Sequence, residues 1–345
     1  MGRKTWFLIV GLLVAMPAAD ALLWHIAVGR LEDGFAAWVA RCKDAGWTVT
    51  HGRVSAGGWP WAAAMRIRDV TVSGGDALVS GGAKWQTPDL RLRVSLLRLR
   101  SLDIEVLGDQ RIRAGTLPEA VLTGARLMAV SKLTLESETQ EFEVLAERPR
   151  LDSVGGWALS AEQLRMHIQI PALIRAGDAP TGFSLGAESV VLPPSVRWPL
   201  GGTIGQLAFD GTLEGPIPAF QAPMAWAAAW RDGGGSLQVQ NLTVNWGPLS
   251  LTAAATLALD DQLQPMGAGT SKVAGYAATL DALAVGGALS RSATTAAKAV
   301  LSLLAGTPGD GDAADVEVPL TLQYRTLSMR QVPLLRLPEV EWTGQ

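Results

Sequence analysis

Three histidines and one cysteine are the side chains of this chain that most often do catalysis or bind metals. His25, His51 and His167 lie far apart in the sequence, and Cys42 has no second cysteine to pair with. No two of these residues have the spacing of metal ligands on a helix or a hairpin. The sequence therefore predicts no metal site, no cofactor and no intrachain disulfide bond.

Nucleophile and phosphate motifs are equally weak. The chain has no Gly-x-Ser-x-Gly turn of the kind that carries a hydrolase serine. Residues 201–205 resemble a phosphate loop but lack its lysine and its strand-to-helix context. A run of carboxylates with the spacing of a solvated strand face comprises Glu136, Glu138, Glu141, Glu143 and Glu147. A glycosidase-type pair stays open there, since spacing alone does not distinguish it, but no enzymatic activity is expected.

The charge balance argues against nucleic acid as a partner. The formal net charge is -3, and charged residues make up 18% of the chain against 48% hydrophobic residues. Phosphate binding needs a concentrated basic face. The one basic run, Arg91, Arg93, Arg98 and Arg100, alternates with leucines, which is typical of the wet face of a strand. A role of this run in binding phosphate or lipid headgroups is the less favoured alternative.

The N-terminus has the pattern of an export signal. Arg3 and Lys4 precede an apolar core over residues 6–19, and small residues follow it. Apolar residues continue beyond Asp20 over 22–28, giving about the 20 residues that span a bilayer. We expect an uncleaved signal anchor over residues 1–45 that continues into an amphipathic, membrane-proximal helix. A cleaved signal peptide with a soluble periplasmic product is the alternative.

The distribution of charge predicts the orientation of this anchor. Positive residues lie before the apolar segment, and Asp20, Glu32 and Asp33 lie within or after it. Positive flanks stay on the cytoplasmic side of a membrane. A single-pass protein of the bacterial inner membrane is therefore expected, with the bulk of the chain in the periplasm.

After residue 46 the sequence alternates apolar and polar residues in short runs. Leu90, Leu92, Val94 and Leu96 form one such run, and Gly, Pro, Asp and Asn separate most of the runs. Period-two alternation places the apolar residues on one face of each strand, and the separators predict hairpins. The fold expected is mainly β with minor α, an elongated, curved antiparallel sheet that is β-taco or sandwich-like, with short packing helices.

Two alanine-rich segments break the alternation and predict helices. One covers 219–231, with Trp226 and Trp230 four residues apart, and the other covers 276–304, with a hinge at Gly286-Gly287. Both are poor in charge, so we expect them to pack on a face or an end of the sheet. We divide the rest of the chain into an N-terminal β-rich half, 46–218, and a C-terminal half, 219–345.

Several stretches together resemble the DUF2125 family of alphaproteobacterial envelope proteins, which has no assigned function. They are Gly46-Trp47-Thr48-Val49, Gly57-Gly58-Trp59-Pro60-Trp61, Trp85-Gln86-Thr87-Pro88-Asp89-Leu90, Asn245-Trp246-Gly247-Pro248-Leu249, the helices from Tyr276, and Leu327-Ser328-Met329 with Pro333-Leu334. The second stretch departs from the Gly-Phe-Pro type of that family. The layout is similar to that of envelope proteins of the AsmA type. That resemblance implies a membrane helix before a β-sheet with an apolar groove for lipid, as an analogy of architecture.

Three functions stay open from the sequence. The favoured one is an anchored periplasmic protein that binds lipid acyl chains in an apolar groove, with membrane lipid as its partner, for envelope lipid transport or maintenance. The second is a non-enzymatic structural or adaptor protein with a closed apolar core that binds other envelope proteins, and the third is a hydrolase with an unfamiliar motif. The positions expected to line the groove are Leu92, Ile104, Val244 and Leu322.

Overall fold

The computed structural model describes residues 3–76, 81–132, 139–171, 181–218, 222–304, 316–329 and 332–342. Side chains are described from Ala15 onward. Glu136 and Glu138 of the carboxylate run lie outside the described residues, and so do Leu133 and Leu135, whose alternation predicts a strand, and the loop predicted over 306–312. Leu303 and Leu304, predicted to lie on the apolar face of the last helix, have no described side chains.

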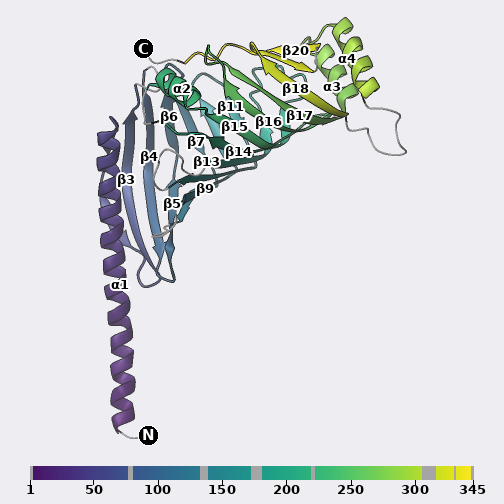
Figure 1. The fold of residues 1–345 in the computed structure, drawn as a ribbon. Helices are drawn as coiled ribbons and strands as arrows, with labels where there is room; N and C mark the ends of the chain where they lie inside the picture. Colours follow the sequence, from purple (N-terminus) through teal and green to yellow (C-terminus); the bar gives the residue numbers. More distant parts are fainter. Residues whose placement is uncertain are drawn as a thin grey trace.

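A single helix, α1 (Arg3–Asp44), precedes the sheet. Its inner face recurs every three or four residues as Trp24, Val28, Leu31 and Phe35, and these side chains pack against the first strands. The helix stands at one edge of the sheet, and its N-terminal half extends past the strand ends (Figure 1). Within the described side chains of α1, no segment is long and apolar enough to qualify as a membrane span.

Twenty strands in the described part of the chain form one antiparallel sheet. The first half contains β1 (Thr48–Thr50), β2 (Val54–Gly57), β3 (Ala62–Gly74), β4 (Ala83–Ser95), β5 (Arg98–Leu107), β6 (Gln110–Ala114), β7 (Ala120–Thr123), β8 (Arg126–Lys132), β9 (Thr139–Glu147), β10 (Arg150–Ser153), β11 (Ala158–Ser160), β12 (Gln163–Pro171), β13 (Thr181–Val191) and β14 (Thr203–Glu214). The second half contains β15 (Ser236–Trp246), β16 (Leu249–Leu259), β17 (Pro265–Ala274), β18 (Val316–Gln323), β19 (Thr326–Met329) and β20 (Val332–Arg336). The prediction of a mainly β chain with a large antiparallel sheet after an N-terminal helix is confirmed.

The strand pairing forks in the first half and rejoins. β3 pairs with β1, β2 and β4, and β4 then pairs with β5 at one end and β6 at the other. One arm continues through β8, β9 and β12, the other through β7, β10 and β11, and both reach β13. From β13 to β20 each strand pairs with the next one in sequence. Pairing therefore continues across the expected domain boundary at residues 218 and 219, and the division into two halves stays a prediction.

A line of backbone irregularities, which we call the bulge line, crosses the sheet where the arms diverge. Its members are residues 51–53, 108–109, 124–125, 148–149 and 161–162 between strands, and Asp69, Pro88, Ser189 and Gly205 within strands. Inserting one residue into a strand shifts the alternation by one position and bends the strand. Ile67 and Val70, three residues apart, are both fully buried in the same cluster. Asp69 lies opposite Pro88 with the same register on both sides, so the shift by one position occurs in both strands and keeps the apolar residues on one face.

Backbone strain marks the same line. Asp69 has φ 52°, Arg148 φ 45° and Ser189 φ 52°. This left-handed region is tolerated by Gly, Asn and Asp and is avoided by other residues, so Arg148 and Ser189 are the more strained of the three. Gly108 has φ +79°, and a Cβ there would lie 2.7 Å from Cγ of Pro88 on the neighbouring strand. Both its conformation and its close approach therefore require glycine.

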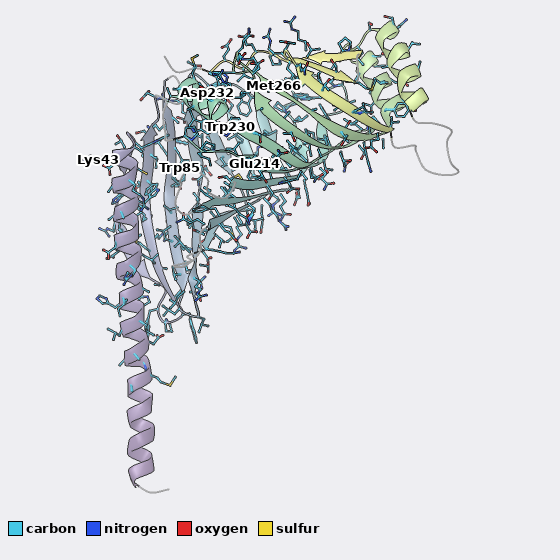
Figure 2. All side chains as sticks on the ribbon, viewed as in Figure 1. Lys43, Trp85, Glu214, Trp230, Asp232 and Met266 are labelled. Atoms are coloured by element: carbon cyan, nitrogen blue, oxygen red, sulfur yellow. The ribbon has the colours of Figure 1, made fainter. Side chains whose placement is uncertain are left out.

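Three helices follow in the second half. α2 (Pro223–Asp232) begins at a proline and lies at one end of the strands, where Nε1 of Trp230 donates to the carbonyl of Glu214 at 3.2 Å (Figure 2). α3 (Tyr276–Val285) and α4 (Arg291–Leu304) form a hairpin that Lys298 and Asp281 join by an ion pair of 2.6 Å. The helices expected over 219–231 and 276–304, with the hinge at Gly286-Gly287, are present, although α2 begins four residues later.

Ser189 offers a test of the bulge line. Ser189→Gly is expected to leave the free energy of unfolding unchanged or raise it by up to about 1 kcal/mol, because glycine removes the left-handed strain. Ser189→Val is expected to lower it by about 1–2 kcal/mol. Chemical denaturation monitored by circular dichroism measures both. Glu188→Val, at the exposed but extended neighbouring position, is the control, and an equal loss there would contradict the role of the bulge.

Candidate apolar binding face

Residues that pair across neighbouring antiparallel strands point to the same face of a sheet. One continuous row of this kind runs from β3 to β18 as Ile67, Leu90, Val106, Leu127, Ala146, Leu164, Ala187, Leu207, Val244, Leu251, Val273 and Val316. Every member is aliphatic. The strand register thus assembles the alternation of single strands into an unbroken apolar row across twelve strands.

A second row lies two residues away on each strand, on the same face. It comprises Met65, Leu92, Ile104, Ala129, Val144, Met166, Leu185, Phe209, Leu242, Ala253, Ser271 and Val318. Eleven of its twelve members are apolar. We call the surface that carries these two rows the apolar face.

Three polar side chains on the apolar face donate hydrogen bonds to backbone carbonyls. The Thr87 hydroxyl donates to the carbonyl of Asp89 at 3.2 Å, and the Ser271 hydroxyl donates to that of Val318 at 3.3 Å. Nε2 of Gln110 donates to the carbonyl of Gly108 at 2.7 Å. A donor that is satisfied locally adds little polarity to its surroundings, so these residues preserve the apolar character of the face.

The helices cover the two ends of the apolar face. At the first end, α1 buries Met65, Ile67 and Leu92 in one cluster. At the other end, Tyr276 of α3 packs against Val316 and Val318. The helices make their main contacts with β1, β3, β16 and β18 in the described part of the chain.

The middle of the apolar face, from β8 to β15, is only half-buried. Its large side chains there include Leu127, Leu164, Leu207, Phe209 and Val244, and all of them keep part of their surface accessible. Phe183 and Phe209 stack with their ring centroids 5.2 Å apart. An aliphatic and aromatic surface of this kind can hold apolar chains.

The four positions predicted to line a groove all lie on the apolar face, in three different surroundings. Leu92 is 9% exposed within the α1 cluster, and Ile104 packs at the edge of that cluster. Val244 lies in the half-buried middle. Leu322 is 8% exposed and pairs with Gly267 and Leu327. Their role as a lining stays a prediction, and sequence alternation alone did not identify Phe183 and Phe209 as the aromatic centre of the face.

The opposite face of the sheet is polar and carries Arg91 and Arg93 of the basic run. Arg91 pairs with Glu105 at 2.8 Å, and Arg93 and Arg100 are exposed; the side chain of Arg98 is not described. His167 lies on this face opposite Glu143 of β9. Among the described residues, no three His, Cys, Asp or Glu side chains come together as a metal site.

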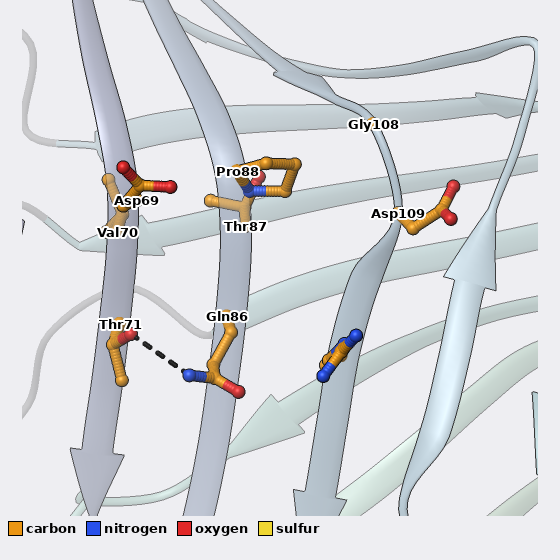
Figure 3. A pocket seen from close by; sticks show the side chains of 9 residues that line it. Asp69, Val70, Thr71, Gln86, Thr87, Pro88, Gly108 and Asp109 are labelled. Atoms are coloured by element: carbon orange, nitrogen blue, oxygen red, sulfur yellow. Dashed lines mark hydrogen bonds between the residues drawn. The ribbon is translucent and has the colours of Figure 1, made fainter. Parts of the chain in front are cut away.

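A hollow of about 520 Å³ lies on the bulge line (Figure 3). It is lined by Asp69, Val70, Thr71, Gln86, Thr87, Pro88, Gly108, Asp109 and Arg111. Thr71, Gln86 and Arg111 pair in register, and Nε2 of Gln86 donates to the hydroxyl of Thr71 at 3.3 Å. The hollow lies where the partner of β4 changes from β6 to β5.

Asp89 forms a charged pair beside this hollow. Nε of Arg66 donates to both of its carboxylate oxygens, at 2.8 and 2.7 Å. These hydrogen bonds hold the pKa of Asp89 below its ordinary value against the opposing effect of burial, and the charges of Arg66, Arg68 and Arg91 add to the decrease. The Asp89 side chain is 11% exposed, whereas Asp152, paired with Arg150, is 44% exposed.

Replacing Asp89 is expected to destabilise the fold in a pH-dependent way. A lowered folded pKa contributes stability above the unfolded pKa of about 3.9, and this stability is lost as the pH falls through the folded pKa. Asp89→Asn should therefore lower the unfolding temperature at pH 7, and its difference from wild type should shrink below about pH 4. Asp152→Asn, in the exposed pair, should have a much smaller effect. Equal effects of both substitutions across the pH range would contradict the assignment.

The family model of the uncharacterized bacterial proteins DUF2125 matches residues 24–338. No curated protein and no solved structure matches the chain. The match begins at Trp24, where α1 meets the sheet, and ends two residues after β20, so it covers the whole apolar face. The chain belongs to the DUF2125 family.

Proposed function

We propose that this protein is anchored in the bacterial inner membrane by α1 and binds lipid acyl chains along its apolar face in the periplasm. The observation that carries this proposal is the unbroken apolar surface across twelve strands, which helices cover only at its ends. This layout is similar to that of AsmA-type envelope proteins, and transport or maintenance of envelope lipids is the role that we infer.

The dimensions of the apolar face support an acyl ligand. Neighbouring strands lie about 4.8 Å apart, so the six strands from β8 to β15 provide an apolar path of roughly 24 Å. A single acyl chain occupies one leaflet, about half of the bilayer's hydrocarbon thickness of about 30 Å, so the path is long enough for one chain. Each methylene that leaves water contributes about 0.8 kcal/mol, so a single acyl chain along this path has enough contact area for stable binding.

Copurified lipid tests the proposal. The full-length protein, purified in mild detergent, is expected to carry phospholipid that mass spectrometry detects in stoichiometric amount. Val244→Asp should remove most of this lipid, because a carboxylate in the middle of the apolar face penalises an acyl chain. Thr252→Asp is the matched control, since Thr252 is exposed on the opposite face of the neighbouring strand. Wild-type protein without lipid would favour the alternative, a structural or adaptor protein of the envelope whose apolar face is closed by its own side chains.

Leu92 and Val244 should separate packing from binding. Leu92→Asp places a charge within the α1 cluster and is expected to lower the free energy of unfolding by several kcal/mol, on the order of 3–5. Val244→Asp should cost less, because Val244 keeps contact with solvent. Denaturant titration of the two variants measures the difference. If both lose stability equally, Val244 is plain core, and the middle of the face is not free for a ligand.

A further inference from the structure

Two neighbouring turns expose large apolar side chains at one end of the sheet. Trp59 and Trp61 lie in the turn between β2 and β3 and are 54% and 71% exposed. Leu97 and Leu99 lie at the turn between β4 and β5 and are 84% and 55% exposed. The backbone N–H of Leu96 donates to the carbonyl of Trp61 at 3.1 Å, which holds the two turns side by side. We call these four residues and their turns the apolar tip.

The apolar tip is fixed at a defined height along α1. Nε1 of Trp24 donates to the carbonyl of Gly57 at 3.1 Å, at the start of the first of the two turns. The C-terminal end of α1 leads into β1, which pairs with the far end of β3. The helix and β3 therefore lie side by side, and Trp24 marks the level at which the sheet ends.

α1 continues beyond the tip in the direction in which the tip points (Figure 1). Residues 3–23 are helical and, at 1.5 Å per residue, extend about 30 Å past Trp24. Met16, Leu22 and Leu23 are exposed on this part of the helix. A helix of this length reaches across the hydrocarbon layer of a bilayer, and the tip then lies at the boundary between lipid and water.

The composition of the tip fits this boundary. Tryptophan favours the headgroup region, where its ring meets lipid and its N–H meets water. Arg100 is exposed directly after Leu99. A cation beside apolar side chains favours an anionic phospholipid surface. If the tip instead bound a soluble partner, nothing would explain why it points in the same direction as the projecting part of α1.

We propose that the apolar tip inserts into the headgroup region of the phospholipid bilayer that holds α1. This contact keeps β3 pointing away from the membrane alongside α1, with the first residues of β3 at the membrane surface. This inference rests on the membrane anchoring under the proposed function and adds a second contact. In that position the first strands of the apolar face begin at the lipid surface. An acyl chain leaving the bilayer then meets the sheet without crossing open water.

Site-specific fluorescence on the full-length chain tests this contact. In a Cys42→Ala background, Leu97→Cys is labelled with a polarity-sensitive dye, and the chain is reconstituted in vesicles of phosphatidylethanolamine and phosphatidylglycerol. We expect a blue-shifted emission that spin-labelled phospholipid quenches. Val285→Cys, which replaces a side chain 90% exposed on α3, is the control and should keep the emission seen in water. A Leu97→Cys label that behaves like the control on vesicle-bound protein overturns the proposal.

Removal of the rings gives a second measurement. The double substitution Trp59→Ser and Trp61→Ser should abolish most of the quenching at position 97, whereas Val154→Ser, in an exposed turn outside the tip, should leave it unchanged. Unchanged quenching in the double variant overturns the role of the rings. Cosedimentation with vesicles reports on the anchor, and copurified lipid reports on the apolar face. A chain that fails to cosediment overturns the anchor and the tip together, whereas loss of copurified lipid alone leaves the tip contact intact.

Discussion

The constraint on which the rest of the structure depends is that the apolar residues of every strand must stay on one face. In a sheet of twenty strands, a slip of one residue in any strand would move its apolar set to the polar face. The chain meets this constraint even where it bends. At Asp69 and at Ser189 one residue in a left-handed conformation shifts the alternation by one position, and the register with the neighbouring strand is the same on both sides. The energetic cost of such residues, about 1 kcal/mol or more, is small beside the burial that a correct register protects.

Cover of the apolar face by helices differs along the sheet. α1 packs on β3, whose Ala63, Ile67 and Val70 are fully buried, although β3 already pairs with β1, β2 and β4. At the other end, Tyr276 packs against Val316. Strand pairing alone therefore does not bury these side chains, and from β8 to β15 the large side chains of the face keep part of their surface accessible.

Much of the fold was accessible from the sequence, because alternation and helical spacing are local patterns. The run at 90–96 lies in β4, and the alanine-rich segment 276–304 forms two helices with a glycine hinge. The bulge line was not predicted, although the spacing of three between Ile67 and Val70, and between Ala187 and Val190, is its trace in the sequence. The fork of the pairing at β4 was beyond prediction, since it depends on contacts between residues far apart in the chain.

For the apolar face, the sequence predicted which residues lie on it but not which of them a helix covers. Leu92, Ile104, Val244 and Leu322 all lie on that face, because alternation determines which side of a strand a residue occupies. Whether a position is covered depends on which helix reaches it. The inner residues of α1 recur at helical spacing from Trp24 to Phe35, which is visible in the sequence. Their contact with β3 and β4 depends on tertiary packing, which the spacing does not predict. Leu92 and Val244 thus look alike in sequence and differ in burial.

The position of α1 connects these points. One helix covers the first strands of the apolar face and, through the bond from Trp24 to Gly57, sets the level at which the sheet ends. Beyond that level, Met16, Leu22 and Leu23 are exposed, whereas Val28 and Leu31 behind it are packed against β3. A free helix of about 30 Å is costly to keep ordered in water without tertiary contacts, so this part of the chain needs another surface. A bilayer would supply that surface on the side of the molecule where the apolar face begins. The covered first strands, the projecting helix and the exposed turns then all follow from one arrangement, in which α1 lies alongside β3 and continues past its end.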